Sequence, residues 1–222
     1  IWMTDMPAEQ AYLNEAGVFM DRNLGAVSTV PGDVGALGLM YQWGRKDPFL
    51  GSSSITTSTA AKSTIKWPAA VASDSLTGTM EYATANPTTF ITYNTLNNDW
   101  YYTDEAAVDA TRWLLASEPK TIYDPCPAGW RIPEGGADVT WGTALGVKTY
   151  KTCTFDKTNK GLQMGGLLGE DENIWYPASG NIDHSTGKLA RVSTAGIWWT
   201  VDLYKTGQHY VSVIFINGSN GR

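Results

Sequence analysis

One segment constrains this chain more than any other: residues 123–133, which read Tyr-Asp-Pro-Cys-Pro-Ala-Gly-Trp-Arg-Ile-Pro. Prolines flank Cys126, so the backbone is held extended on both sides of it and cannot begin a helix there. Gly129 permits a sharp turn, after which Trp130 and Ile132 are expected on one face of a short strand. A cysteine in so rigid a setting favours a structural role over that of an exposed, activated thiol. The segment therefore indicates a binding domain held together by a disulfide of Cys126, and not an enzyme that uses this thiol.

The chain has two cysteines, which permit one internal disulfide, Cys126 to Cys153. They also permit Cys126 to pair with a cysteine beyond Arg222, if the chain is part of a longer protein. Their number alone does not place the protein in an oxidising compartment. The chain begins at Ile1 without a signal-peptide pattern, so we interpret it as a mature or excised fragment. No stretch approaches the ~18 apolar residues of a membrane span.

Composition narrows the class of partner. The chain of 222 residues is long enough for one large domain with a sizeable core. Its 10 Trp and 11 Tyr exceed its 5 Phe, and such rings suit half-buried positions where a polar edge reaches water or a ligand. A net charge of −6 without any run of Lys and Arg argues against nucleic acid. Residues 67–111 contain no Lys or Arg, and this acidic surface is either simply solvated or a cation or partner site.

The pattern along the chain is one of short strands between turn residues, with few helices. It predicts a single α+β domain over residues 1–222, with mostly short antiparallel strands, long loops and an exposed insertion around residues 52–66. The strand over 210–216 is apolar on both faces and is expected to be central in its sheet. Helices are expected from Thr103 to Leu115 and from Asp138 to Gly146, each beginning at a capping residue. The other expected strands are 17–20, 37–43, 89–93, 150–155, 161–164, 174–177 and 196–201.

The sequence contains no recognisable catalytic signature. His184 and His209 are isolated, and there is no nucleophile elbow, phosphate loop, dinucleotide fingerprint or zinc-protease motif. Asp104 and Glu105 are adjacent, so on a helix they would diverge and could not flank a glycosidic bond. We therefore expect a protein that is not an enzyme and has no catalytic residues.

Two clusters of oxygen-bearing side chains are weak candidates for calcium. Residues 170–173, Glu-Asp-Glu-Asn, crowd carboxylates into a loop after several glycines, although their spacing matches no EF-hand. An acidic turn is the commoner explanation of such a run. Residues 97–99, Asn-Asn-Asp, form a second cluster of the same kind. The sequence thus predicts no cofactor and no dedicated metal ligand, with calcium as the one alternative.

The best candidate for ligand binding is the loop formed by Asn98, Asp99, Trp100, Tyr101 and Tyr102. Sugars bind to such combinations, because rings cover their apolar C–H faces while planar polar groups bond their hydroxyls. The alternative is that Trp100 anchors this loop in the core.

Several motifs in order resemble the opening of domains in Bacteroides fimbrillin-family surface proteins and the later blocks of the related Fibrobacter major paralogous domain. The resemblance covers nearly the whole chain. The matching segments are 20–26 (MDRNLGA), 38–49 (GLMYQWGRKDPF), 86–91 (NPTTFI), 98–100 (NDW), 120–127 (KTIYDPCP), 175–180 (WYPASG) and 196–200 (GIWWT).

This resemblance implies a C-type-lectin-like fold and a place on the cell surface, associated with the outer membrane or a pilus. It implies an adhesin or pilus-tip domain that binds a glycan or a host or bacterial surface protein. The alternative is a structural module that contacts other pilus subunits. The family pattern ends in a Val-Arg-Cys-Val block, before which this chain stops, so it implies that Cys126 has its partner beyond Arg222, with Cys153 as the alternative.

Overall fold

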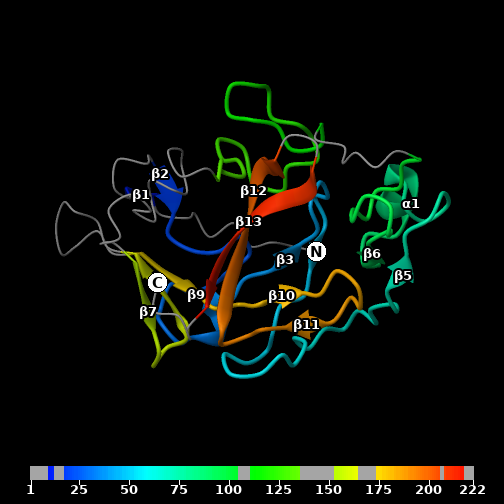
Figure 1. Cartoon of the computed structure of the whole chain (residues 1–222). Coiled ribbons are helices and arrows are strands. Elements are labelled where there is room, and N and C mark those ends of the chain that lie inside the picture. Colours follow the sequence, from blue (N-terminus) through cyan, green and yellow to red (C-terminus); the bar gives the residue numbers. More distant parts are fainter. Residues whose placement is uncertain are drawn as a thin grey trace.

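Strands that pair two or three at a time make up most of the regular structure (Figure 1). The computed structural model describes residues 10–12, 18–104, 111–135, 153–164, 174–205 and 208–217. Within these residues the strands form six small sheets, and no sheet has more than three strands. The expected helix over 138–146 and the acidic run 170–173 lie outside the described residues.

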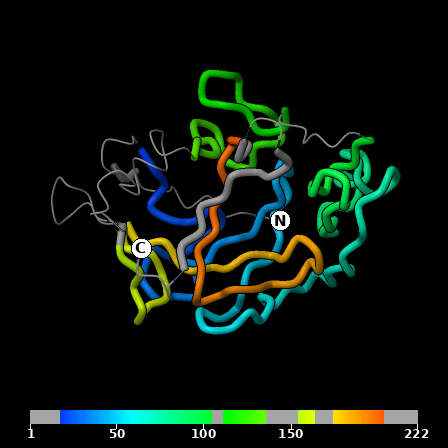
Figure 2. The backbone as a smooth tube through the Cα atoms, viewed as in Figure 1, coloured from blue at the N-terminus to red at the C-terminus, as the bar shows by residue number. Residues whose placement is uncertain are grey.

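The longest element is an antiparallel hairpin of β12 (Ala195–Lys205) and β13 (Gln208–Asn217). Trp198 faces Ile214 across the ladder, and the register shifts beyond Trp199. Figure 1 shows this hairpin in the middle of the molecule, and the loops of residues 111–135, green in Figure 1 and Figure 2, lie at one end of it. Within the described part of the chain β13 pairs with β12 alone. The strands predicted over 196–201 and 210–216 are therefore confirmed, but among the described residues β13 lies at the edge of its sheet, whereas we expected it in the centre.

Three strands form a meander near the other end of the hairpin: β7 (Cys153–Asp156), β8 (Gly161–Met164) and β9 (Ile174–Pro177). The bounds of β8 and β9 are those predicted from sequence, and all four residues of β9 are buried. Gly161 is required because the ring of Trp175 lies over it, where a Cβ atom would overlap the indole. The sequence thus defines this sheet through both its apolar runs and its glycine.

Four further pairs of strands are only two or three residues long. Of these, β5 and β6 are parallel, and the other three pairs are antiparallel. The pairs are β1 (Gln10–Tyr12) with β2 (Val18–Met20), β3 (Met40–Tyr41) with β4 (Pro48–Phe49), β5 (Val71–Ala72) with β6 (Ile91–Thr92), and β10 (Asn181–Ile182) with β11 (Leu189–Ala190).

Helical structure is scarce in the described residues. A 3₁₀ turn, η1, spans Val34–Ala36, and the α-helix α1 spans Met80–Ala85. The side chain of Thr79 accepts a hydrogen bond from the backbone N–H of Tyr82 and so begins α1 as an N-cap. Residues 111–115 form turns and bends, so the prediction that a helix reaches Leu115 is wrong.

Two aromatic clusters of the core, formed by residues that the structure describes, meet at Trp100. One contains Trp43, Trp113 and Val201, and the other contains Ile91 and Trp100 with Ala83 of α1. The indole Nε1 of Trp100 donates to the backbone carbonyl oxygen of Trp43 over 2.6 Å, which joins the two clusters.

Taken together, the elements give a mostly-β or α+β domain, in agreement with the predicted class at this level. No helix of the described residues is long and apolar enough to cross a membrane.

Candidate ligand-binding groove

A cavity of 640 Å³ lies between the β12–β13 hairpin, β3 and the surrounding loops. This volume is within the range of about 300–1,000 Å³ that is usual for ligand sites in proteins. Aromatic side chains form much of its wall; among them are Tyr41, Tyr93, Trp130, Trp198 and Trp199. We call this cavity the groove.

One part of the groove wall consists of uncharged side chains, Tyr41, Cys126, Ile132 and Trp199, and we call it the inner groove; Arg22, Asp99, Arg131, Glu134 and Arg191 also border the groove. The indole Nε1 of Trp199 donates to the carbonyl oxygen of Tyr41 over 2.8 Å, and Ile132 packs against the same aromatic cluster. Burial raises the pKa of the Tyr41 hydroxyl, and the neighbouring Cys126 adds to the rise. Burial also raises the pKa of the Cys126 thiol, and the charge of Asp124 raises it further. Both groups therefore stay protonated at neutral pH, and this thiol is a poor nucleophile.

A more polar end of the groove is formed by two loops that are distant in the sequence. The rings of Tyr93 and His184 lie 4.7 Å apart between centroids, and the backbone N–H of Tyr93 donates to the carbonyl of His184 over 3.1 Å. Arg191 donates to the side-chain oxygen of Asn181 over 3.4 Å. Asn98 borders the groove and is exposed, and its backbone N–H donates to the carbonyl of Asn94, the residue that follows Tyr93. We call Tyr93, Asn98, Asn181, His184 and Arg191 the polar end.

Trp100, the centre of the predicted ligand-binding loop, belongs to the core. Its side chain is only 3% exposed. The guanidinium groups of Arg45 and Arg112 lie 5.5 and 5.0 Å from its ring, as cation–π partners. With its ring covered and its Nε1 bonded to Trp43, Trp100 cannot serve as an exposed platform for a sugar. The prediction of a stacking role is wrong for this residue, and the alternative of a core anchor is confirmed.

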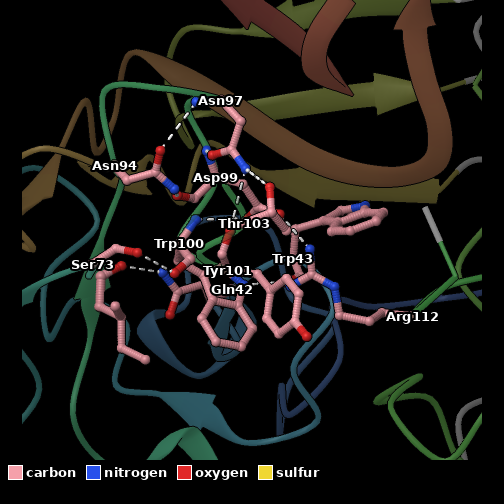
Figure 3. A network of polar contacts seen from close by, with 11 residues as sticks. Gln42, Trp43, Ser73, Asn94, Asn97, Asp99, Trp100, Tyr101, Thr103 and Arg112 are labelled. Atoms are coloured by element: carbon pink, nitrogen blue, oxygen red, sulfur yellow. Dashed lines mark hydrogen bonds and ion pairs between the residues drawn. The ribbon is translucent and has the colours of Figure 1, made fainter. Parts of the chain in front are cut away.

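Asp99 is also buried, at 7% exposure, and forms an ion pair with Arg112 (Figure 3). Burial pushes the pKa of Asp99 upward, and the Arg112 guanidinium with two backbone N–H groups opposes that rise. Asn97 is fully buried, and its side-chain oxygen accepts the backbone N–H of Asp99 over 3.0 Å. Asn94 accepts the N–H of Asn97 in turn. The oxygens of residues 97–99 that we considered for calcium are thus largely used in bonds within the protein.

The other predicted binding residues lie differently. Tyr101 is half-buried, with the Arg112 guanidinium 4.8 Å from its ring. The backbone N–H of Tyr102 donates to the carbonyl of Gly78 over 2.8 Å. Neither tyrosine borders the groove, whereas Asn98 does so as an exposed side chain and Asp99 and Trp100 do so as parts of its buried wall.

Cys126 is half-buried, borders the groove and carries a free thiol. Asp124 holds the surrounding turn, because its carboxylate accepts the backbone N–H groups of Cys126 over 2.8 Å and of Ile132 over 3.2 Å. The segment is therefore fixed as predicted, but the strand expected over 130–132 is absent from it. The side chain of Cys153 lies outside the described part of the chain, so the disulfide partner of Cys126 stays a prediction.

Within the described residues, no group of three or more His, Cys, Asp or Glu side chains could hold a metal ion. The acidic run 170–173 is not among them, and calcium binding there stays a prediction. Sequence reasoning also missed the part of His184 and Tyr93 in the groove. The two are 91 positions apart, since 184 minus 93 is 91, and neither lies in a motif that would have connected them.

Comparison with models of known protein families, with curated proteins and with solved structures finds no match to this chain. Its function is therefore argued from the groove.

Proposed function

We propose that this chain is a non-enzymatic binding domain that recognises a glycan or a protein ligand through the groove. The single observation that carries the proposal is the 640 Å³ cavity lined by aromatic rings and by a smaller number of polar side chains. Half-buried Trp and Tyr rings present apolar faces while their polar edges remain available. Pockets that combine such walls with a few placed polar groups are the usual sites of ligand recognition.

The resemblance to fimbrillin-type surface proteins extends this proposal. On this resemblance we propose an adhesin or pilus-tip module of the bacterial cell surface with a C-type-lectin-like fold. Strands with little helix and long loops are compatible with that fold, and loops carried by a rigid scaffold commonly form binding sites. The absence of an activated nucleophile at Cys126 supports a binding role over a catalytic one.

The test is a glycan-array screen of the purified domain, run with calcium and with a chelator. Trp130→Ala should reduce any signal, because Trp130 borders the groove and is half-buried. Ile122→Ala is the matched control, since Ile122 is 76% exposed and does not border the groove. A signal that is lost in chelator would direct attention to residues 170–173. A signal unaffected by Trp130→Ala would contradict a ligand site in the groove.

A second candidate, a structural module that contacts other pilus subunits, is favoured by the free edge of β13. Backbone N–H and C=O groups along such an edge can pair with a strand from another chain. On the opposite side of the hairpin, β12 is partly covered: Val201 donates to the carbonyl of Pro133, and Gly196 forms a bridge with Gly180. The uncovered edge among the described residues is therefore that of β13.

Hydrogen exchange measured at increasing protein concentration tests this second candidate. If β13 receives a strand from another subunit, alternate amides of β13 become protected as oligomers form in sedimentation experiments. A chain that stays monomeric, with β13 amides exchanging at a constant rate, would argue against an assembly role through this edge.

A further inference from the structure

We infer that Asn98 is the side chain by which the polar end of the groove recognises a neutral sugar residue, together with Tyr93 and His184. This inference rests on the proposed binding function and adds the ligand class and the recognising residue.

Asn98 is an exposed residue between two buried polar ones. On one side of it Asn97 has no exposed surface, and on the other Asp99 is 7% exposed. Both neighbours are fixed, Asn97 by its bonds to Asn94 and Asp99, and Asp99 by its ion pair with Arg112. Asn98 and Asp99 both border the groove, and of the two only Asn98 is exposed.

The backbone at Asn98 is held in the left-handed region, with φ of 57°. Only a few per cent of non-glycine residues adopt this conformation, and Asn is one of the types that tolerate it best. The backbone N–H of Asn98 donates to the carbonyl of Asn94 over 3.1 Å, which closes the turn. The protein therefore fixes the backbone of Asn98, and with it the direction in which the side chain leaves the chain, and such preorganisation lowers the entropy lost on binding.

Tyr93, Asn98 and His184 carry side-chain hydrogen-bonding groups that have no partner among the described residues; the Tyr93 and His184 rings contact each other at 4.7 Å. All three border the groove. They offer an amide, a phenol and an imidazole to whatever binds there.

Those groups fit a neutral sugar better than the alternatives. An amide donates and accepts at once, so it can bond two adjacent hydroxyls of a pyranose, each of which also donates and accepts. The neighbouring rings can cover the C–H face of the sugar. The nearest carboxylate of the loop, Asp99, already has Arg112 as its partner, so it does not demand a cationic ligand. Five charged side chains border the groove, and each has a partner within the protein: Arg22 pairs with Asp21, Asp99 with Arg112, Arg131 bonds the carbonyl of Leu115, Glu134 accepts the N–H of Ala116, and Arg191 bonds Asn181.

The experiment titrates the protein with methyl glycosides of glucose, galactose, mannose, fucose and N-acetylglucosamine, and with methyl glucuronide as an acidic comparison. Binding is measured by saturation-transfer NMR and by titration of the protein signals. Asn98→Gly is the central variant, because glycine adopts φ of 57° without strain and only the amide is removed. Lys160→Gly is its control, since Lys160 also has a left-handed φ, 59°, and lies outside the groove.

At least one neutral glycoside should bind the wild-type chain, and Asn98→Gly should weaken that binding by about tenfold or more, as expected for loss of a two-bond contact. Lys160→Gly should leave it unchanged. Asn98→Asp should retain more binding than Asn98→Gly, because a carboxylate still accepts bonds from sugar hydroxyls.

Three results would overturn the inference. Equal binding by wild type and Asn98→Gly would remove Asn98 from the site. Preference for methyl glucuronide, with Asn98→Asp the weakest variant, would show an anionic ligand. Binding of no neutral glycoside, while a glycan-array signal is still lost in Trp130→Ala, would reject this subsite and leave the proposed function standing. Loss of the array signal in all conditions would instead count against the proposed function itself.

Discussion

Arg45 and Arg112 lie against the same tryptophan, Trp100, and both are almost fully buried. Arg112 has a carboxylate partner in Asp99, whereas the hydrogen bonds of Arg45 go to Gln42 and to backbone carbonyls, among them that of Ala83 in α1. Carbonyls near the end of a helix carry partial negative charge, which favours a cation there. Burial lowers the pKa of Arg45 to about 10, so the residue is still protonated at neutral pH. The two arginines thus fix Trp100 and the loop that follows it.

At Trp100 we predict a large loss of stability on Trp100→Ala, about 3–5 kcal/mol, because the change leaves a cavity between the two arginines. Trp100→Phe should cost less, since it keeps a ring but loses the bond from Nε1 to the Trp43 carbonyl. Urea denaturation measures both, with Ile122→Ala as a surface control that should change the free energy of unfolding by less than about 0.5 kcal/mol. Normal stability of Trp100→Ala, together with lost ligand binding, would restore Trp100 as a ligand-stacking residue.

Among the elements, the turn between β10 and β11 matters most to the site, because it carries His184. Asp183 holds this turn: its carboxylate accepts the hydroxyl of Ser185 over 2.6 Å and that of Thr186 over 2.9 Å, together with their backbone N–H groups. These bonds, the one from Ser185 foremost, lower the pKa of Asp183 to about 2. The carboxylate is therefore ionised at any pH at which the groove is expected to work.

This lowered pKa predicts a dependence of stability on pH. The folded value of about 2 lies below the ordinary value of 3.8, so the stabilisation is fully present above about pH 4 and is lost as the pH falls through 2. Because the group is largely open to solvent, we expect the loss to be no more than about 1 kcal/mol. Unfolding by urea at pH 5, 3 and 2 should show this loss in wild type and not in Asp183→Asn. An equal loss in the variant would place the effect in other carboxylates.

Elements with a strong local signal were predictable from sequence. The strands β8 and β9 begin and end as expected, because their apolar runs are bounded by turn residues. A strand was predicted over residues 37–43, but the structure has only the two residues of β3 there. Gly38 interrupts the predicted strand, because its φ is 73°. Gly44 also has φ of 73°, and its missing side chain leaves room for Arg112: a Cβ atom at Gly44 would lie 2.8 Å from the Arg112 side chain. The six residues of α1 were missed because a helix so short has little periodicity.

The site was predictable only in part, because much of it depends on contacts between segments that are distant in the sequence. Asn98 stands out locally, since an amide beside aromatic residues is typical of sugar sites. The burial of Trp100 depends on Arg45 and Arg112, and no local pattern reveals that contact. The groove likewise depends on contacts between distant segments, such as the bond from Trp198 Nε1 to the side-chain oxygen of Asn23 over 3.0 Å.

For the whole molecule, the disulfide pairing of Cys126 leads to a prediction about the reactivity of its thiol. In the native chain its thiol should react slowly with a disulfide reagent such as dithionitrobenzoate at pH 8, because burial raises its pKa and little thiolate is present. In urea that protection disappears, so a free thiol should then react at the rate of an ordinary cysteine.

The same experiment distinguishes the possible partners. If Cys126 pairs with Cys153 in protein purified without reductant, neither reacts in urea until reductant is added, and Cys153→Ser then exposes Cys126 to the reagent in urea without reduction. If both cysteines react in urea from the start, Cys126 has no partner within these 222 residues. Fast reaction of Cys126 in the native state would contradict its burial beside Tyr41. It would then imply an inner groove more open to water than the contacts of Trp199 and Ile132 allow.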